Sequence, residues 1–442
     1  MGMENRYDKY KDSGIAWIGE IPEHWNTYQL KRCSKFINGY AFNSSHFNKD
    51  KGIPVIRIGD ILNEQISFEN IVYVQEDNEL EKFIAHKNDI LIAMSGATVG
   101  KIGIYSSEDK VYINQRVGII RTVQYNFIKR MFTTNGFVDY VNLSSAGSAQ
   151  PNISSEGILN FHIPAPSIKE QRSIATYLDQ KCSEIDELIT LQEEMITKLQ
   201  SYKQSVITEA VTKGLDKNVP LKDSGIEWIG EIPEHWNFYR IKYHFSVISG
   251  SGFKNEIQGC TNGEIPVCKA SDISNAGKEL FESSNYLSKE IAIKEGFNII
   301  PTGSILFPKI GEAMKKNNRS IAMIECCLDN NCQALIPTNI NCIYSYYVFK
   351  IIDMSWYDNG GTIPSINNQK LINSFIPYPP LSEQQSIADY LDQKCSEIDE
   401  LISIKQQKIE KLKDYKKSLI FECVTGKKKS KLISKCQRKG VK

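Results

Sequence analysis

Two stretches of the chain carry apolar residues at alternating spacings of four and three. In the first stretch these positions are Leu178, Cys182, Ile185, Ile189, Ile196, Leu199, Val206 and Ala210. In the second stretch they are Leu391, Cys395, Ile398, Ile402, Ile409, Leu412, Leu419 and Cys423. A narrow stripe with this period is typical of a coiled-coil seam rather than of the broad apolar face of a core helix. Each stretch runs for about 40 residues without Pro or Gly, which predicts a helix of ~60 Å.

The charges on these two helices indicate how they pair. The second helix begins acidic, with residues such as Asp399, and ends basic, with residues such as Lys405 and Lys416. The first helix also begins acidic, with residues such as Asp186. Parallel pairing would bring the two acidic starts together, whereas antiparallel pairing sets acid against base. We therefore expect an antiparallel coiled coil, with an ordinary intradomain bundle as the alternative.

The regions outside the helices contain short runs rich in Ile, Val and Tyr, bounded by Gly, Asn, Asp and Pro. Such runs are typical of strands, and they predict mixed α/β or mostly β domains with few helices. We expect strands at residues 53–58, 89–94, 101–105, 117–120, 265–269, 304–307 and 320–324.

An internal duplication organises these elements. The sequence DSGIAWIGEIPEHWN at residues 12–26 recurs at 223–237 with one difference, and we call these two stretches the aromatic segments. The sequence SIATYLDQKCSEIDELI at 173–189 recurs at 386–402, again with one difference. The period is too long for a solenoid, whose repeats run to roughly 20 to 50 residues. It indicates that a whole domain was duplicated together with its helix.

The predicted fold is α+β, with two mixed α/β domains related by a pseudo-two-fold axis and joined by the two helices. The predicted boundaries are a first domain at 1–166, a first helix at 167–214, a second domain at 215–380, a second helix at 381–426 and a basic tail at 427–442.

The charge balance looks unfavourable for binding nucleic acid. The 442 residues include 53 Lys plus Arg and 52 Asp plus Glu, a net charge of +1. However, eight of the cations and none of the acids lie from Lys427 onward, so a basic tail follows a mildly acidic body. We expect this tail to be disordered. It either contacts phosphates non-specifically or acts as a solubilising terminus.

Other features of the composition limit the class of protein. No window approaches the ~18 apolar residues that a membrane span needs, so we expect a cytoplasmic protein without membrane contact. The eleven cysteines are scattered, which favours free thiols over a disulfide framework. Cys326, Cys327 and Cys332 lack paired spacing and a nearby histidine, and we expect no metal site there.

Motifs for catalysis are incomplete. GATVGK at 96–101 is one residue short of a phosphate-binding loop, and Ile102 stands where a Ser or Thr should follow. The YPP sequence at 378–380 lacks the Asn or Asp that an adenine-methyltransferase motif needs. His24 and His235 belong to the aromatic segments and are interpreted as structural. We therefore predict no catalytic residues and no cofactor of the chain's own.

Polar and basic side chains in the loops of the two domains are the candidates for contact with DNA. Arg, Lys, Asn and Gln can fork onto guanine and adenine edges, while Ser, Thr and Lys hold phosphates. In the first domain the candidates are Asn43, Lys49, Arg57, Ser95, Thr98, Lys101, Asn114, Gln115, Arg116, Gln150 and Asn152. In the second domain they are Lys254, Asn255, Lys269, Lys309, Lys315, Lys316, Asn317, Asn318, Arg319, Asn331, Gln333, Thr362, Asn367 and Asn368. Solvated loops contain the same residue types, and that interpretation stays open for each position.

The four tryptophans of the aromatic segments could form stacking platforms for bases. Their near-identity in the two halves instead favours packing at the base of each domain, because surfaces that read different bases should differ.

Taken together, the pattern resembles the specificity subunit of type I restriction-modification systems. The resemblance rests on the duplicated D-S-G-I-x-W-I-G-E-I-P-E-H-W, on the paired P-x-x-x-E-Q-x-x-I-A-x-Y-L-D segments at 166–179 and 379–392, and on C-S-E-I-D-E-L-I in each helix. The match in organisation covers nearly the whole chain.

The resemblance implies a non-catalytic subunit whose two variable domains each read half of a bipartite, asymmetric DNA target while the paired helices fix the gap. It also implies two methylation subunits that bind S-adenosylmethionine, and motor-nuclease subunits that use ATP and magnesium. A combined methyltransferase-nuclease and a two-headed scaffold are the alternatives from other classes.

Overall fold

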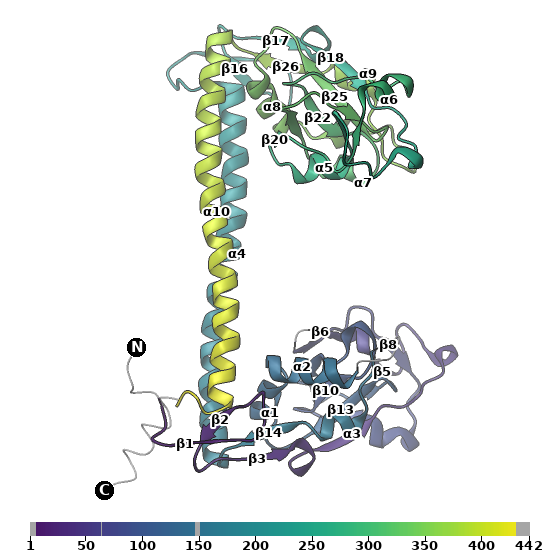
Figure 1. The fold of residues 1–442 in the computed structure, drawn as a ribbon, viewed down its shortest axis with the longest axis vertical. Coiled ribbons are helices and arrows are strands. Elements are labelled where there is room, and N and C mark those ends of the chain that lie inside the picture. The colour runs from purple at the N-terminus through teal and green to yellow at the C-terminus, as the bar shows by residue number, and fades with distance from the viewer. Residues whose placement is uncertain (1–5, 63, 146–150, 430–442) are drawn as a thin grey trace. The chain divides into compact units, whose positions relative to one another are not determined.

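The computed structural model describes residues 6–62, 64–145 and 151–429 (Figure 1). The chain divides into two compact units. The first unit contains the chain up to Gln192 and again from Gln407, and the second unit contains Glu193–Gln406. Each unit thus combines one globular domain with part of each long helix.

The two long helices are continuous. Helix α4 spans Ile168–Lys213 and helix α10 spans Leu381–Val424. None of the predicted seam residues is exposed: Leu178, Ile185, Leu391, Ile398 and Ile409 are buried, and Ile189, Ile196, Leu199, Ile402 and Leu412 are half-buried. The alternating spacing therefore identifies the side chains that pack between the helices.

The helices run antiparallel, as their charges predict. In the first unit Lys416 on α10 lies 2.7 Å from Asp186 on α4. In the second unit Lys203 on α4 lies 2.7 Å from Asp399 on α10. Each lysine comes from the later part of one helix and each aspartate from the earlier part of the other, so the acidic starts do not meet.

The first domain contains two four-stranded sheets that face the core with buried Ile, Val and Leu side chains. One sheet has the order β11 (Ile102–Ile104), β10 (Ile90–Ala93), β13 (Val117–Arg121) and β4 (Lys35–Asn38). The other has the order β8 (Val72–Val74), β5 (Ile53–Ile56), β12 (Val111–Ile113) and β9 (Ile84–Ala85). A small hairpin, β6 (Ile61–Leu62) and β7 (Gln65–Ile66), and helices α1 (Tyr125–Met131), α2 (Asn135–Ser144) and α3 (Ser155–Leu159) complete it.

The second domain repeats this plan with one sheet extended. The larger sheet has the order β18 (Phe245–Ser249), β25 (Cys332–Pro337), β22 (Ile305–Pro308), β23 (Ser320–Ala322) and β20 (Glu279–Leu280). The smaller has the order β21 (Tyr286–Leu287), β19 (Ile265–Cys268) and β24 (Cys327–Leu328). The helices are α5 (Ala270–Asn275), α6 (Lys289–Lys294), α7 (Glu312–Lys315), α8 (Cys342–Ile351) and α9 (Asn368–Asn373).

The domains contain more helix than the sequence pattern indicates. Most of these helices are too short for an apolar period to be recognised. The ten-residue helix α8 is hidden for another reason: all its side chains from Tyr344 to Phe349 are buried, so it has no polar face to reveal the helical period.

The aromatic segments pack at the start of the long helices. Each contributes a short hairpin, β1 (Tyr10–Asp12) with β2 (Glu20–Pro22), and β15 (Leu221–Asp223) with β16 (Glu231–Pro233). Strand β3 (Asn26–Gln29) then pairs with β14 (His162–Ala165), and β17 (Asn237–Arg240) pairs with β26 (Phe375–Tyr378). Each pairing brings the beginning of a domain to the strand that precedes its long helix.

Two buried tryptophans fix this junction. Trp25 donates from Nε1 to Glu170 at 3.2 Å, and Trp236 donates to Glu383 at 2.9 Å. Both indoles are fully buried, and both glutamates lie in the first turn of a long helix. The packing role predicted for the aromatic segments is thus confirmed for these two tryptophans.

Three findings concern sites and segments expected to be absent. No helix among the described residues is long and apolar enough to cross a membrane. The ten cysteines in the described part of the chain are free thiols. Within the same residues, no group of three or more His, Cys, Asp or Glu side chains is arranged to hold a metal ion.

Candidate nucleic-acid interface

Several predicted contact residues of the first domain lie where its strands end. Strands β5 and β12 run parallel, so Arg57 and Asn114, which follow them, lie at the same edge. The amide of Asn114 donates to the last carbonyl of β5 at 2.9 Å. The amide of Met94, which follows β10, donates to the carbonyl of Arg116 at 2.9 Å. We call this group the first loop cluster: Tyr40, Arg57, Ser95, residues 114–116 and Asn152.

The second domain builds the same arrangement from a different sequence. The amide of Asp329, after β24, donates to the last carbonyl of β19 at 3.1 Å. The amide of Lys309, after β22, donates to the carbonyl of Asn331 at 2.8 Å. Each of these bonds has a counterpart in the first domain. We call this group the second loop cluster: Ser251, Lys269, Lys309, residues 329–331 and Ser365.

One glycine in each domain makes the close approach of strands possible. A Cβ atom on Gly39 would lie 2.0 Å from the carbonyl oxygen of Asn114, and a Cβ on Gly250 would lie 1.9 Å from that of Asp329. Any side chain at either position would therefore displace the turn that carries the cluster. The Tyr40 and Ser251 amides that follow donate to the last strand carbonyls before these turns, both at 3.0 Å.

The side chains of the first loop cluster differ in their exposure and in whether they have hydrogen-bond partners. Gln115, Arg116 and Asn152 are exposed, and no side-chain partner of Arg116 is found within the described residues. Arg57 is half-buried, and its Nη2 donates to the carbonyl of Asn70 at 2.7 Å. Ser95 is buried, so its contribution is to the backbone. The available polar groups of this cluster are therefore an unpaired guanidinium and two amides.

The second loop cluster presents a different set. Lys309 is half-buried and has no side-chain partner in the part of the chain that the structure describes, and Asn331 is exposed. Lys269 donates to Gln258 at 2.8 Å and lies over the ring of Phe253. The cations of this cluster are lysines, whereas those of the first are arginines, so the two domains offer different hydrogen-bonding patterns on a common frame.

Other predicted positions lie outside the two clusters. Asn43 accepts from the Ser45 amide and Asn367 from the Lys370 amide, each at the start of a helical turn. Lys254 is paired with Glu295 at 2.6 Å, and Lys315 with Glu312 at 3.0 Å. The exposed candidates Lys49, Lys101, Lys316 and Thr362 and the half-buried Thr98 complete this group. Gln150 lies outside the described residues.

The prediction for Arg319 is wrong. Its side chain is 1% exposed and donates to the carbonyls of Asn317 and Ile352 inside the second domain. The run from Lys315 to Arg319 looks like a basic loop in the sequence, but β23 begins at Ser320 and carries Arg319 into the interior. Asn318 is half-buried beside it and donates to Ser274 at 3.0 Å. Neither side chain belongs to a loop cluster.

The duplication of this frame could have been recognised in the sequence. Residues 37–42 and 248–253 share the pattern I-x-G-x-x-F, which contains the close-approach glycine. Residues 55–60 and 267–272 share the pattern V-x-cation-x-x-D. The aspartate of this second pattern accepts from the backbone amide of the cation, at 2.8 Å in Arg57 and 2.7 Å in Lys269. Aligning the variable regions on these patterns would have identified Tyr40 and Ser251 as equivalent positions.

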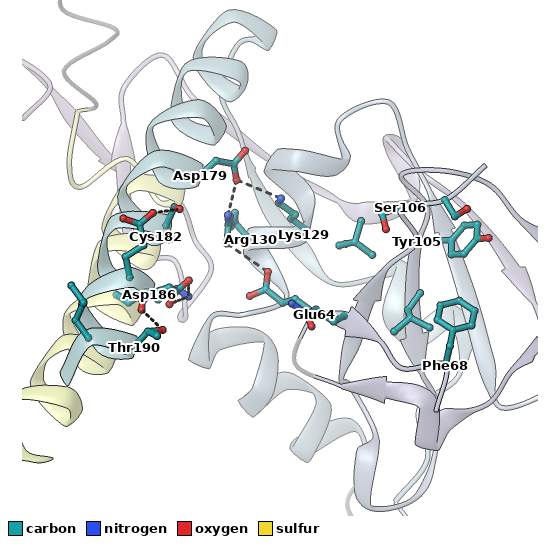
Figure 2. A pocket seen from close by; sticks show the side chains of 18 residues that line it. Glu64, Phe68, Tyr105, Ser106, Lys129, Arg130, Asp179, Cys182, Asp186 and Thr190 are labelled. Carbon is teal, nitrogen blue, oxygen red and sulfur yellow. Dashed lines mark hydrogen bonds and ion pairs between the residues drawn. The ribbon is translucent and has the colours of Figure 1, made fainter. Parts of the chain in front are cut away.

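Each domain is also tied to the helix pair by a duplicated aspartate. In the first unit Arg130 and Lys129 reach Asp179 on α4, at 2.6 and 3.4 Å (Figure 2). In the second unit Lys278 reaches Asp392 on α10 at 2.5 Å. Burial alone would lower the pKa of Arg130, but its hydrogen bond to Asp179 and the nearby negative charges of Glu64 and Asp179 together outweigh burial and raise this pKa above its usual value. Arg130 is therefore held charged between the helix and Glu64, which lies 3.6 Å from it.

Comparison with known proteins adds an independent finding. A family model described as the type I restriction modification DNA specificity domain matches residues 22–200 and 233–414. The putative type I restriction enzyme MjaX specificity subunit of Methanocaldococcus jannaschii is 25% identical over 431 residues, covering 93% of this chain and 95% of that one. The type I restriction enzyme EcoBI specificity subunit of Escherichia coli is 23% identical over 440 residues, covering 94% and 88%.

Solved structures share the fold. A chain from a study of complex assembly and conformational transition of the type I R-M system superposes with a TM-score of 0.71 at 16% identity, covering 91% of this chain and 98% of that chain. The HsdS subunit from Thermoanaerobacter tengcongensis superposes with a TM-score of 0.51 at 17% identity, covering 92% and 98%.

Proposed function

Because the chain belongs to the family of type I restriction-modification DNA specificity proteins, we propose that each of its domains reads one half of a bipartite DNA target. Its role as the DNA-recognition subunit follows from the family. The observation that carries the proposal is the pair of loop clusters, which have one backbone frame and different side chains. Two domains that present different side chains on the same frame would recognise two different half-sites, so the DNA target would be asymmetric.

Within each cluster, the side chains without an internal partner are the proposed base readers. Arg116 and Gln115 in the first cluster have the forked groups that recognise guanine and adenine edges in the major groove. Lys309 has the corresponding group in the second cluster, and Asn331 is added because it is exposed, although its Nδ2 also donates to Asp329 at 3.2 Å. Asn43, Lys49, Thr98, Lys101, Lys254, Lys315, Lys316, Thr362 and Asn367 remain proposed contacts outside the clusters, and positioning on phosphates suits their residue types.

The two long helices are proposed to set the gap between the half-sites. A continuous helix has a fixed rise per residue, so a helix pair is a spacer whose length is defined by its sequence. Helices α4 and α10 have 46 and 44 residues and contain neither Gly nor Pro. The duplicated ion pairs Asp186–Lys416 and Asp399–Lys203 hold them in one register.

The chain is a non-catalytic subunit whose partners are DNA and the other subunits of a restriction-modification complex. We further propose that two methylation subunits, which bind S-adenosylmethionine, modify adenine after flipping it out of the duplex. Motor-nuclease subunits would supply ATP- and magnesium-dependent cleavage. The outer faces of α4 and α10 and the aromatic segments are the proposed docking surface for the methylation subunits.

An exchange of domains tests the proposal. Residues 27–165 are replaced by the equivalent region of another family member, and the complete system is expressed in a host whose methylated sites are mapped by long-read sequencing. One half-site should change while the other half-site and the gap stay the same. A change in both half-sites would show that the two domains do not read DNA independently.

A further inference from the structure

A cavity of about 490 Å³ lies in the second unit, between its globular domain and the long helices. Its walls come from α4, α10, α5, α8 and the start of β23. The charged side chains that line it are four cations and two carboxylates, an excess of two positive charges: Lys203, Lys278, Arg319, Lys350, Asp392 and Asp399. Two of the cations are paired, because Lys203 contacts Asp399 and Lys278 contacts Asp392.

The other two cations have no carboxylate partner within the described residues. Arg319 is 1% exposed, its terminal nitrogens donate to Asn317 and Ile352, and its buried Nε has no partner. Lys350 reaches into the same space from α8, with its Nζ 5.7 Å from the centre of the Tyr346 ring. Arg319 is buried and Lys350 is half-buried. A cation withdrawn from water without a counter-charge is costly, so both groups favour an anion in this cavity.

The electrostatics of the two side chains agree with this geometry. Burial, together with the nearby charges of Arg319 and Lys203, lowers the pKa of Lys350 to about 8, against the smaller opposite effect of Asp399. Burial likewise lowers the pKa of Arg319 to about 9. An anion between them would compensate both charges.

The corresponding groove of the first unit is a natural control (Figure 2). It uses the equivalent helix positions, with Asp179 for Asp392 and Asp186 for Asp399. Its cation Arg130, unlike Arg319, is paired with carboxylates, because it lies between Asp179 and Glu64, as Figure 2 shows. Three cations and four carboxylates line this groove, an excess of one negative charge: Glu64, Lys129, Arg130, Asp179, Asp186, Glu187 and Lys416. The positive excess is therefore a property of the second domain and not of the duplicated helices.

We propose that the cavity of the second unit binds a phosphate group, held by Lys350 and Arg319. Asn318 also lines the cavity, and its amide, which donates to Ser274 at 3.0 Å, has a second N–H for an oxygen of the phosphate. The enclosed position of Arg319 favours a free anion, inorganic phosphate or the phosphates of a nucleotide, over the backbone of a duplex. Because the ligands come from α8 and β23 and the wall from α4 and α10, a bound phosphate would brace the second domain against the helix pair.

Thermal unfolding and calorimetry of the full chain test the proposal, with inorganic phosphate as the probe. The protein is dialysed into a chloride buffer, and phosphate is added at constant ionic strength. The unfolding temperature should rise with phosphate, and calorimetry should detect binding at one site. Absence of binding to the unchanged chain would overturn the proposal.

Variants separate a ligand site from a structural role. Lys350→Met should weaken phosphate binding at least tenfold and should not lower the unfolding temperature in chloride, because it removes an uncompensated buried charge. Lys350→Arg should retain binding, and Lys129→Met, in the control groove, should leave it unchanged. If Lys350→Met bound phosphate like the unchanged chain, or if Lys129→Met lost binding equally, the assignment would be wrong.

Competition identifies the source of the phosphate. A DNA duplex added at saturating concentration should leave phosphate bound, and a nucleoside triphosphate should displace it. Displacement by the duplex would contradict the assignment to a free anion and would make the cavity a contact for the DNA backbone.

Discussion

The ammonium group of Lys416 lies 2.7 Å from the carboxylate of Asp186 across the helix pair of the first unit. The same pair recurs in the second unit as Lys203 with Asp399, at equivalent positions of the duplicated helices. An antiparallel pairing of two similar helices places every such contact twice, once in each unit. At these positions, the charges that predict the antiparallel orientation in the sequence therefore form ion pairs across the helices in the structure.

Charge reversal at this contact tests how much the ion pair contributes to the stability of the fold. Lys416→Asp should lower the free energy of unfolding by roughly 0.5–1 kcal/mol, because a partly exposed ion pair is replaced by two neighbouring carboxylates. The double variant Lys416→Asp with Asp186→Lys should recover most of the loss. Urea unfolding measures both values.

Lys413→Asp is the matched control, since Lys413 lies on the same helix and contacts only Glu410 of that helix. Equal loss in this control, or no recovery in the double variant, would show that the cross-helix pair is not what stabilises the register.

The helices could be predicted from sequence and the interiors of the domains could not, for a physical reason. Seam residues such as Leu178 and Leu391 repeat with a fixed period over many turns, so the signal accumulates. The burial of Arg319 depends instead on a single turn. Asn317 adopts a positive φ of 58°, and the chain then enters β23. Nothing periodic marks that change of direction, so a basic loop and a buried arginine look alike in the sequence.

The loop clusters could be predicted from the sequence only in part. The sequence predicts β5 and β19 but not β12 and β24. The convergence of the loops depends on the parallel pairing of β5 with β12 and of β19 with β24, which joins segments far apart in the chain. Alternating apolar residues do not reveal which strands pair. Only the close-approach glycines, Gly39 and Gly250, carry that information locally.

Replacing Arg319 should destabilise the second domain without changing the target. Arg319→Met removes the guanidinium that donates to the carbonyls of Asn317 and Ile352, which costs about 1–3 kcal/mol. The exposed neighbour in Lys316→Met should cost less than about 0.5 kcal/mol. Urea unfolding measures these losses, and methylome sequencing reports the target. A changed half-site with unchanged stability would instead return Arg319 to the set of base readers.

Replacing Arg116 should affect recognition of one half-site. Arg116→Ala removes an exposed guanidinium that has no internal partner, and the loss of a bidentate base contact costs about 1–3 kcal/mol, roughly 10- to 100-fold in affinity. The complex with methylation subunits is titrated with duplexes that carry substitutions in either half-site. Discrimination should weaken in one half only.

Lys35→Ala is the control for Arg116, because Lys35 is exposed on β4 at the end opposite Gly39. It should leave discrimination unchanged in both halves. If Lys35→Ala reduced specificity as much as Arg116→Ala, the first loop cluster would not be the reading surface.

Acid should weaken the junction between the first aromatic segment and α4. Burial on its own would raise the pKa of Glu170, but hydrogen bonds from His24, Ser167 and Trp25 outweigh it and hold this pKa below its usual value. A carboxyl whose pKa is lower in the folded chain stabilises the fold above its unfolded pKa of about 4.3 and loses that contribution as pH falls. The free energy of unfolding should therefore decrease as pH falls below about 5 and continue to decrease through the lower pKa of the folded state.

Glu170→Gln isolates this contribution. The amide cannot carry the negative charge, so the variant should be less stable near neutral pH and should show a weaker dependence on acid than the unchanged chain. Trp25 fluorescence reports the junction directly, since its indole donates to Glu170. Parallel pH curves for the two proteins would indicate that Glu170 has the same pKa in the folded and unfolded states.

Lengthening both helices should change the gap and leave both half-sites unaltered. One heptad is inserted after Gln192 in α4 and one after Gln406 in α10, at the boundary between the two units, so that the seam and both ion pairs are kept. Seven residues add about 10 Å of helix, close to the rise of three base pairs, so the gap should grow by about three. Inserting four residues instead breaks the seven-residue repeat and should destabilise the pair. Methylome sequencing measures the gap, and a heptad variant that methylates the original site would show that the helices do not determine the spacing.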